Sequence, residues 1–405
     1  MYSSNLISVQ KALQIIENIK ITINKEYILL DEANTRVLAE DMEVLVDVPP
    51  FDRSAMDGYA VIAEDTSDAS SSNPLYLDVI DEIGAGSVSE HTLNHGQAIR
   101  IATGAPMPAG SNAVIMEEDT QQTGNKIKIT KKVAFNRDVA LKGEDLKKGE
   151  IILREGQILG PHHLSVIASS GYNKVKVFKK PKIGIIITGN ELVEPTTELE
   201  PGKIVNSNRF ALKGLVEDSH AVPYIKHCSD DLDLMMDELR EDIEKYDVVI
   251  TTGGTAISKG DVVVDATSKL GEVLFHGVAI KPGKPVGFGV VNNKPVFMLS
   301  GYPVAAAVQF DIFVRNYILK IQNIHKGFDL IKCTAGDDIR SVEGKCNIIR
   351  AKLEGNVVYP IRTKAGINKS IVMSNCYIFA DEDAGDIKKG EECSVLKYSS
   401  LKVFE

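Results

Sequence analysis

The chain has 405 residues, of which 43% are hydrophobic and 25% charged, a composition typical of soluble globular proteins. This length exceeds what one compact core usually organises, so we expect two to four domains. The 46 basic and 56 acidic residues give a net charge of −10, which argues against nucleic acid or an anionic membrane surface as the main partner.

The first 47 residues predict two helices and an extended segment. Apolar residues recur at helical spacing over 8–20, and Ser8 is suited to be the N-cap of this helix. A second, short helix is expected over 31–39. An extended segment at 42–48 then ends at two consecutive prolines.

A small all-β module is expected over 48–141. Short β-like segments alternate there with turns rich in Gly, Pro, Asn and Ser. These segments lie at 76–80, 98–101, 113–116 and 126–129. Mixed character returns over 142–182, with a helix expected near 162–170. We therefore interpret the β module as an insertion between two halves of one elongated domain, 1–47 and 142–182.

Strands and helices alternate from residue 183 to 325, which is typical of a doubly wound α/β domain built on a parallel sheet. The expected strands lie at 183–187, 222–226, 248–250, 286–291 and 296–299. The expected helices lie at 208–218, 229–243, 261–270 and 303–322. Short strands and turns return over 326–405, which predicts a second small β domain.

The five cysteines are widely spaced and odd in number, which favours reduced thiols in an intracellular protein over a disulfide framework. They are Cys228, Cys333, Cys346, Cys376 and Cys393. The N-terminus shows no basic segment followed by an apolar run, and no stretch reaches the roughly 20 apolar residues of a membrane span. We therefore expect a cytoplasmic protein.

Three loops that follow strands of the α/β domain are candidates for ligand binding, because open α/β sheets bind ligands beyond the carboxyl ends of their strands. They are residues 188–192, 251–261 and 299–303, and their candidate ligand-binding residues are Thr188, Gly253, Gly254 and Ser300. Backbone N–H groups beside glycine or at a helix start attract anions, so the three loops together favour a phosphate-bearing ligand. A single glycine in such a loop is more often a simple turn.

The segment AIKPGKP, residues 279–285, places Lys281 and Lys284 on either side of Gly283 in a loop stiffened by two prolines. Two fixed ammonium groups beside an exposed backbone N–H suit a tetrahedral dianion. A solvated lysine pair in a turn is the alternative interpretation, and the residues alone favour neither strongly.

Carboxylates near the same strand ends predict a cation site. Glu191 and Asp261 could hold Mg²⁺ together with phosphate oxygens. Asp230 and Asp231 stand at the start of a helix, where acidic residues usually only favour the helix dipole. The isolated histidines have no ligand spacing and are interpreted as structural. They are His162, His163 and His276.

Two segments of the β module are dense in glycine, proline and small polar residues. Loop geometry explains the glycine and the prolines, but not Asp52, Ser54 and Asp57 in one loop or Thr103 in the other. We interpret these polar residues as a binding rim.

Together these segments resemble the molybdopterin molybdenumtransferase family, the MoeA type to which the E domain of gephyrin also belongs. The resemblance covers essentially the whole chain. The matching pieces are PPFDRSAMDGYAV (49–61), RIATGAPMPAGSNAVIMEE (100–118), GED (143–145), TGNEL (188–192), TTGGT (251–255), AIKPGKP (279–285) and SGYPV (300–304).

The resemblance implies an elongated, L-shaped subunit with four regions. They are a dimerisation domain (1–47 and 142–182), an inserted β domain (48–141), a doubly wound α/β molybdopterin-binding domain (183–325) and a C-terminal β barrel (326–405). It also implies a homodimer with active sites between subunits. The family inserts molybdate into adenylylated molybdopterin and releases AMP with the help of Mg²⁺. A molybdopterin adenylyltransferase would be the upstream donor.

Carried onto this sequence, the resemblance implies four catalytic residues, Asp261, Glu191, Lys281 and Lys284, the two lysines binding the oxyanion. The implied cation ligands are Asp261, Glu191, Asp230 and Asp231. The resemblance also implies that Asp145 is an acidic residue facing the cleft. It implies that Arg350 and Ser370 lie near molybdate. The full set of candidate substrate-binding residues is Asp52, Ser54, Thr103, Asp145, Thr188, Gly253, Gly254, Gly283, Ser300, Arg350 and Ser370.

Several positions depart from the usual motifs of the family. Asn190 replaces a commoner aspartate, and Ala256 and Ser258 replace a serine and a glycine. The segment with Tyr302 and Ala305 lacks an asparagine and a hydroxyl. A tungstate-preferring paralogue therefore stays an alternative to an active molybdate transferase. The resemblance leaves a second alternative, a scaffold that keeps the fold without catalysis, and the retained Lys281, Lys284, Asp261 and Glu191 speak against it.

Overall fold

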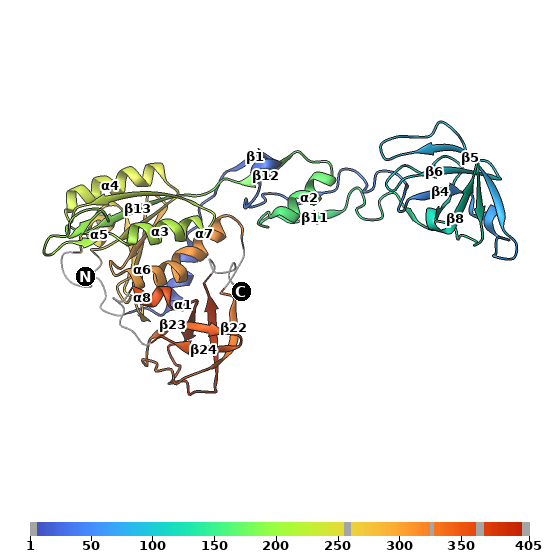
Figure 1. Ribbon diagram of the computed structural model, residues 1–405. Helices are drawn as coiled ribbons and strands as arrows, with labels where there is room; N and C mark the ends of the chain where they lie inside the picture. The colour runs from blue at the N-terminus through green and yellow to red at the C-terminus, as the bar shows by residue number, and fades with distance from the viewer. Residues whose placement is uncertain (1–5, 255–260, 325–327, 362–367, 399–405) are drawn as a thin grey trace.

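The computed structural model describes residues 6–254, 261–324, 328–361 and 368–398. Figure 1 shows an L-shaped chain. A narrow arm carries a β domain at its far end, while an α/β domain and a C-terminal barrel lie together at the other end. This arrangement confirms the multidomain architecture expected from the sequence. None of the helices in these ranges combines the length and hydropathy that crossing a bilayer requires.

Helix α1 (Val9–Asn18) begins where the sequence predicts, because the Ser8 hydroxyl accepts a hydrogen bond from the Lys11 N–H at 3.1 Å. The buried face of α1 joins the core of the α/β domain, whereas the arm begins at the following strand. This face consists of Val9, Ala12 and Ile16.

The arm consists of short strand pairs, a 3₁₀ turn and one helix. They are β1 (Lys25–Leu29) with β12 (Lys174–Phe178), β2 (Met42–Glu43) with β11 (Ile151–Leu153), η1 (Leu30–Glu32) and α2 (Pro161–Ser169). The helix expected near 162–170 is confirmed, but the helix predicted over 31–39 is wrong. Thr35 has a φ of 65°, which ends any right-handed helix, and Val37 is extended and pairs with Ile158.

The inserted domain is a six-stranded sheet in the order β7-β4-β6-β5-β9-β8. Its strands are β4 (Gly58–Val61), β5 (Leu75–Ile83), β6 (Gln97–Ile101), β7 (Ala113–Met116), β8 (Thr120–Thr123) and β9 (Lys126–Ile129). The turns η2 (Ala63–Thr66) and η3 (Glu117–Asp119) and the pair β3 (Arg53–Ser54) with β10 (Val139–Ala140) complete it. Two apolar clusters form its core. All four predicted β segments are confirmed.

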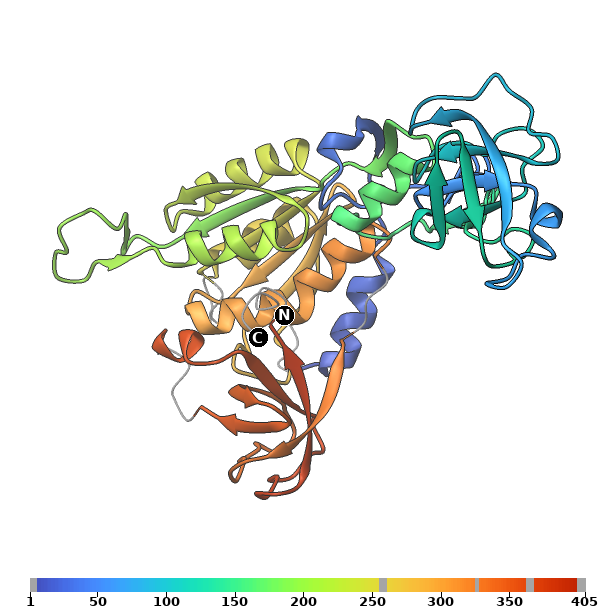
Figure 2. The same ribbon diagram turned by 45° about the vertical axis from the view of Figure 1, so that its right-hand side comes forward.

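The α/β domain is built on a sheet in the order β16-β13-β17-β21-β20-β18. These strands are β16 (Val222–Cys228), β13 (Lys182–Thr188), β17 (Val248–Thr252), β21 (Lys294–Leu299), β20 (Gly287–Val291) and β18 (Glu272–His276). The helices are α3 (Asn208–Glu217), α4 (Leu232–Lys245), α5 (Val262–Leu270), α6 (Pro303–Gln309), the π turn η4 (Phe310–Val314) and α7 (Arg315–Ile321). Helices α3, α6 and α7 contribute to one core and α4 and α5 to the other, which confirms double winding. A projection with β14 (Leu192–Val193) and β15 (Ile204–Val205) extends from this domain in Figure 2.

The central sheet is not parallel throughout, as the sequence had led us to expect. Strand β20 runs antiparallel to both of its neighbours. The cause is the two-residue turn between β20 and β21, where Asn292 and Asn293 have φ values of 49° and 63°. Two consecutive residues with positive φ make the tight hairpin turn that matches strand twist, and a hairpin can join only antiparallel strands.

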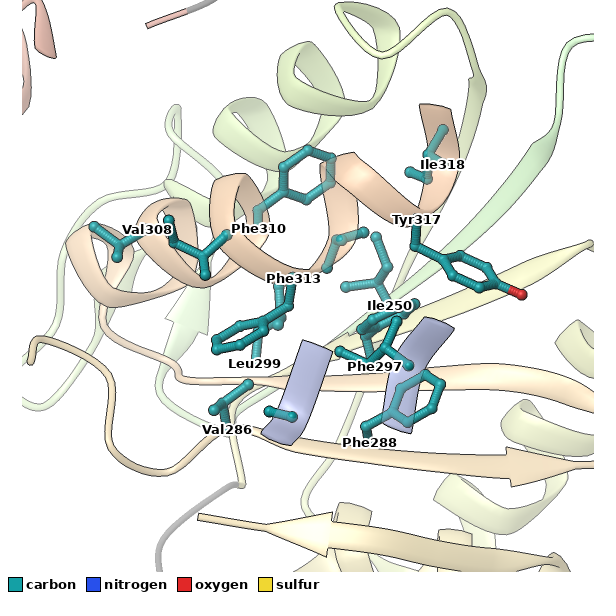
Figure 3. Packing of buried hydrophobic residues seen from close by; sticks show 14 of the residues in the cluster. Ile250, Val286, Phe288, Phe297, Leu299, Val308, Phe310, Phe313, Tyr317 and Ile318 are labelled. Carbon is teal, nitrogen blue, oxygen red and sulfur yellow. The ribbon is translucent and has the colours of Figure 1, made fainter. Parts of the chain in front are cut away.

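Aromatic packing fixes the helix of α6, η4 and α7 on the sheet. The rings of Phe288 and Phe297 lie 4.8 Å apart, and those of Phe297 and Tyr317 lie 5.6 Å apart. Figure 3 shows side chains of this helix, including Phe313, directed onto the strands. Each fully buried side chain of this size stabilises the fold by about 1.5–3 kcal/mol, so the strand ends and the loops that follow them are held firmly.

The C-terminal domain is a closed barrel, as expected. Its strands are β22 (Leu330–Ala335), β23 (Cys346–Glu354), β24 (Val357–Pro360), β25 (Cys376–Ala380) and β26 (Glu392–Lys397), and the short helix α8 (Lys369–Val372) precedes β25. Pairing of β23 with β25 closes the ring. Strand β19 (Ile280–Lys281) of the α/β domain pairs in parallel with β23, so the lysine loop is joined directly to the barrel.

Candidate functional site

The three predicted loops meet at the carboxyl edge of the central sheet. Gly253 has a φ of 98°, and a Cβ at this position would lie only 2.1 Å from the Thr188 carbonyl oxygen. The Thr252 hydroxyl donates to the Ser300 carbonyl at 2.9 Å and accepts from the Asn208 amide at 3.0 Å. The structure therefore brings Thr188, Gly253 and Ser300 together.

We expect Gly253→Ala to destabilise the protein by about 3 kcal/mol, because the added methyl group would overlap the neighbouring backbone and the φ is unfavourable. Thermal and urea denaturation would measure this loss. The matched control is Gly214→Ala in the middle of α3, where a Cβ would meet no atom within 4 Å. That change should be neutral or stabilise by up to ~1 kcal/mol. Equal effects of the two changes would contradict the close approach.

Gln309 couples the lysine loop to the end of β21. Its side-chain N–H group donates to the Gly283 carbonyl at 2.6 Å and to the Ser300 hydroxyl at 2.9 Å. Its Oε1 accepts from the Ser300 N–H at 2.7 Å. Gly283 has a φ of 94°, and a Cβ there would lie 2.7 Å from the Gln309 amide nitrogen. The Ser300 hydroxyl is thus engaged within the protein, and Gln309 is a residue that sequence reasoning missed.

A cavity of about 500 Å³ lies between the lysine loop and the barrel. Its lining residues are Lys281, Pro282, Gly283, Asp338, Ile339, Arg340, Asn347, Ile348, Ile349, Arg350, Pro360 and Ile361. Three of them are basic and one is acidic, so the cavity is electropositive in a chain whose net charge is −10. Burial lowers the pKa of Arg350, which an anion would oppose. Arg340 has no local motif and was not predicted.

Asp261 lies at the start of α5, where its Oδ1 accepts a hydrogen bond from the Val264 N–H at 3.1 Å. Burial raises the pKa of Asp261 to about 7. Its Oδ2 is buried and has no hydrogen-bond partner within the described ranges, and His276 Nε2 lies 3.8 Å away. His276, interpreted as structural from sequence, is therefore a neighbour of this carboxylate.

Asp230 joins the loops that follow β13 and β16. Its carboxylate accepts from the Thr188 hydroxyl at 2.5 Å and from the Asn190 N–H at 3.2 Å. The Asn190 side-chain oxygen accepts in return from the Asp230 N–H at 3.3 Å. An asparagine at position 190 thus avoids a second carboxylate next to Asp230. Asp231 caps α4 by accepting from the Leu234 N–H at 3.0 Å, which agrees with the structural interpretation of this residue.

The carboxylates of this edge do not form a complete metal cage. Where the structure describes the chain, no three His, Cys, Asp or Glu side chains are grouped so that they could hold an ion. Glu191 is exposed. The buried Oδ2 of Asp261 does fit a cation, because Mg²⁺ commonly takes one or two protein carboxylates and completes its shell with phosphate oxygens and water.

The expected single cleft is only partly present in one chain. Lys281, Gly283 and Arg350 line the cavity, whereas Asp261, Glu191 and Lys284 are not among its lining residues. The glycine loop continues through Ala256 and Ser258, which lie outside the described residues. The described part therefore contains two neighbouring elements, an electropositive cavity and a carboxylate edge, linked through Gln309 and the strand ends.

The remaining C-terminal and loop residues have defined places. Ser370 is fully buried in α8, and its carbonyl accepts from the Ser374 hydroxyl at 2.9 Å. Ser370 is not a lining residue of the cavity. Tyr302 is 69% exposed at the start of α6, while Ala305 is buried within that helix.

The polar rim of the β domain is organised by its own contacts. The Asp57 carboxylate accepts hydrogen bonds from the Thr103 N–H at 2.7 Å and from the Thr103 hydroxyl at 3.0 Å. Both hydrogen bonds lower the pKa of Asp57, and the one from the N–H has the largest effect. Asp52 accepts from the Lys142 N–H at 2.7 Å. Ser54 is buried, and its hydroxyl donates to a carbonyl two residues later at 2.5 Å.

The rim is remote from the lysine loop within one chain. Asp52, Ser54 and Thr103 belong to the domain at the far end of the arm (Figure 1). Asp145 is exposed and lies in the chain between β10 of that domain and β11 of the arm. The structure therefore does not bring these residues together with Lys281 or Asp261. A ligand that contacts both groups would need a second subunit.

Family models match three consecutive parts of the chain. They describe a MoeA N-terminal region (domain I and II) over 7–171, a probable molybdopterin-binding domain over 184–320 and a MoeA C-terminal region (domain IV) over 332–398. The matches thus include the cavity, the carboxylate edge and the rim.

Similar proteins are found among both curated sequences and solved structures. A molybdopterin molybdenumtransferase from Staphylococcus aureus is 34% identical over 400 residues, covering 97% of this chain and 96% of that protein. A putative molybdopterin biosynthesis protein from Methanocaldococcus jannaschii is 38% identical over 371 residues, 89% of each chain. A crystal structure of a molybdopterin biosynthesis MoeA protein from Pyrococcus horikoshii OT3 is 38% identical, with a TM-score of 0.86 over 97% of this chain and all of that one.

Proposed function

Because the chain belongs to the MoeA family of molybdopterin molybdenumtransferases, we propose that it inserts molybdate into adenylylated molybdopterin and releases AMP, with the help of Mg²⁺. The chain then acts in molybdenum cofactor biosynthesis, and a molybdopterin adenylyltransferase would supply its substrate.

The observation that carries this proposal is the electropositive cavity between the lysine loop and the barrel. Three basic residues line this cavity, Lys281, Arg340 and Arg350, whereas Asp338 is the one acidic residue among the lining residues. A tetrahedral dianion such as molybdate gains charge-assisted hydrogen bonds from such groups. Because the chain as a whole is acidic, this local charge indicates a specific anion site rather than a general affinity for anions.

The adenylylated pterin would lie along the carboxylate edge next to the cavity. Gly253 and Gly254 both have a positive φ, a backbone geometry that suits close approach of phosphate. Asp261 would hold Mg²⁺ together with phosphate oxygens, and the ion would neutralise charge that builds up when the bond to AMP breaks. Gln309 keeps the lysine loop against the strand ends, so an oxyanion bound at the lysine loop would lie beside the pterin.

We propose that the working unit is a homodimer in which the rim of one subunit meets the α/β domain of the other. Large apolar side chains are exposed along the arm and its junction with the β domain, as on surfaces that become covered by a partner. They are Leu45, Val46, Phe51, Leu141, Ile151 and Val166. The separation of the rim from Lys281 in one chain supports the same arrangement.

Mixing two inactive variants is expected to restore activity if the sites are shared. Asp261→Asn disables the carboxylate edge, and Asp52→Asn removes a charge from the rim while keeping an acceptor for the Lys142 N–H. After random reassociation half of the dimers are mixed and each has one intact site, so about a quarter of the wild-type AMP release should return. No recovery in dimers shown to be mixed would mean that each site lies within one subunit.

The direct test is AMP release from adenylylated molybdopterin by the purified protein, with molybdate and Mg²⁺ present or omitted. We expect release that requires both. The same assay with tungstate in place of molybdate shows which of the two oxyanions the protein prefers. Absence of release under all conditions would favour a non-catalytic scaffold and reject the proposed reaction.

We also propose that the enzyme works in the cytoplasm. All five cysteines are buried free thiols, the state expected in a reducing compartment.

A further inference from the structure

A buried polar network joins the α/β domain to the barrel behind the cavity. It begins at Asp311 in the π turn between α6 and α7. One carboxylate oxygen of Asp311 accepts from Arg315 Nε and Nη2, both at 2.9 Å, and the other accepts from the Tyr377 hydroxyl at 3.0 Å. A π turn inside a helix is often found where a side chain must be directed to a functional site. Here it directs a carboxylate at the barrel.

The network continues through the barrel to α8. The ring of Tyr377 packs against that of Tyr398, with centroids 4.5 Å apart. The hydroxyls of Tyr398 and Ser374 lie 2.7 Å apart, and Ser374 donates to the Ser370 carbonyl at 2.9 Å. The network therefore ends at α8, the short helix that contains Ser370.

Arg350 lies beside the same tyrosines. In the antiparallel pair of β23 and β25, Arg350 is directly opposite Tyr377, so the two side chains project from the same face of the sheet. Arg350 is only 7% exposed and lines the cavity. The network thus stands directly behind one wall of the cavity.

Two of the contacts that hold the barrel to the α/β domain lie beside the cavity. One is the pairing of β19 with β23, where Lys281 is in register with Asn347. The other is the contact of Asp311 with Tyr377. Apolar packing could stabilise the domain interface as strongly as the buried Asp311 carboxylate does. Directional hydrogen bonds, however, fix the relative orientation of the two domains more sharply than apolar packing.

We propose that Asp311, Tyr377 and Tyr398 are positioning residues for oxyanion binding, which orient the barrel so that Arg350 faces the dianion. This inference rests on the proposed function and adds residues that do not touch substrate. It assigns their effect to the binding of the oxyanion and not to the chemical step.

Tyr377→Phe is the main test, because it removes the hydroxyl that Asp311 accepts from and keeps the ring. In the full-length protein the molybdate concentration for half-maximal AMP release should rise about 10-fold, near the lower end of the effect of one lost buried hydrogen bond to a charged group. The rate at saturating molybdate and the KM for the adenylylated pterin should change less than about twofold, because neither depends on Arg350 in this scheme.

The matched control is Tyr317→Phe on α7. Tyr317 is also buried, and in the described part of the chain its hydroxyl has no hydrogen-bond partner. The control variant should keep wild-type molybdate dependence. Tyr398→Phe, which removes the contact with Ser374, serves as a second variant and should resemble Tyr377→Phe.

A double-mutant cycle with Arg350→Gln separates positioning from general destabilisation. If Tyr377 acts through Arg350, then Tyr377→Phe should add little in the Arg350→Gln background. Full additivity, or a Tyr377→Phe variant that behaves like Tyr317→Phe, overturns the inference. Equilibrium dialysis with molybdate gives a second readout without turnover. Wild-type protein that neither binds molybdate nor releases AMP rejects the proposed function itself, which is a distinct result.

Discussion

Asp261→Asn is expected to reduce molybdate-dependent AMP release by at least about 100-fold while the fold stays intact, because loss of a bound cation removes several kcal/mol of transition-state stabilisation. The asparagine oxygen can still accept the hydrogen bond from the Val264 N–H, so helix α5 keeps its N-cap. The substitution removes a carboxylate that can carry a negative charge. The Oδ2 atom of this carboxylate is buried and has no hydrogen-bond partner among the described residues, so it is available to a cation.

Two measurements test the effect of Asp261→Asn. Initial rates of AMP release give the catalytic effect, and circular dichroism with thermal denaturation shows whether the fold persists. Asp247→Asn is the matched control, because Asp247 is another aspartate of the same domain whose carboxylate accepts a backbone hydrogen bond, from the Lys182 N–H at 2.7 Å. It precedes β17 at the opposite edge of the sheet and should leave the rate unchanged. An unchanged rate in Asp261→Asn would remove Asp261 from the cation site.

The second large effect is expected for the double change Lys281→Ala and Lys284→Ala. We expect the molybdate concentration for half-maximal activity to rise at least about 100-fold, because two charge-assisted contacts to a dianion contribute roughly 1.5–3 kcal/mol each and every ~1.4 kcal/mol is a factor of ten. Both lysines are exposed, but Lys281 lines the cavity and Lys284 does not. The Lys284 carbonyl accepts from the N–H groups of Val278 and Val286. The single variants should therefore differ, with Lys281→Ala showing the larger effect.

Lys179→Ala combined with Lys180→Ala is the control for net charge. These two exposed lysines precede β13 and lie outside the cavity, and their removal changes the charge of the chain by the same amount. Titration of the initial rate with molybdate compares the two double variants. A molybdate requirement that rises equally in both would indicate long-range charge, and one that rises in neither would place the oxyanion elsewhere.

Local signals were sufficient to predict much of the fold. The Ser8 cap, the apolar strand cores and the alternation over 183–325 correspond to elements of the structure. The errors occurred where a single backbone conformation overrides periodicity. Thr35 ends the helix predicted over 31–39, and the positive φ values of Asn292 and Asn293 impose a hairpin where a parallel strand was expected.

The loops of the candidate site could be predicted from the sequence, but the residues that hold these loops in place or complete the cavity could not. Glycine and proline in short motifs report the geometry of Gly253 and Gly283 directly, because few other residues tolerate those φ values. Gln309 and Arg340 lie in a helix and a barrel loop without any local pattern. Their roles exist only after the chain brings distant segments together, so no reading of neighbouring residues could identify them.

The departures from the usual family motifs have different structural consequences. Asn190 takes part in a reciprocal contact with Asp230, so a neutral amide has a defined place in the loop after β13. Tyr302 is largely exposed and can face a ligand or a partner subunit, whereas Ala305 is buried within α6. Of these positions, Tyr302 is therefore the one to test for oxyanion preference, by comparing molybdate and tungstate with Tyr302→Asn.

In the proposed function, the cavity between the lysine loop and the barrel holds the metal oxyanion. Anomalous diffraction at the molybdenum absorption edge, from crystals of the full chain grown with molybdate, tests it most directly. We predict a molybdenum peak within the cavity, within contact distance of Lys281 and Arg350. A peak bound at another place on the protein, with this cavity empty, would contradict the account.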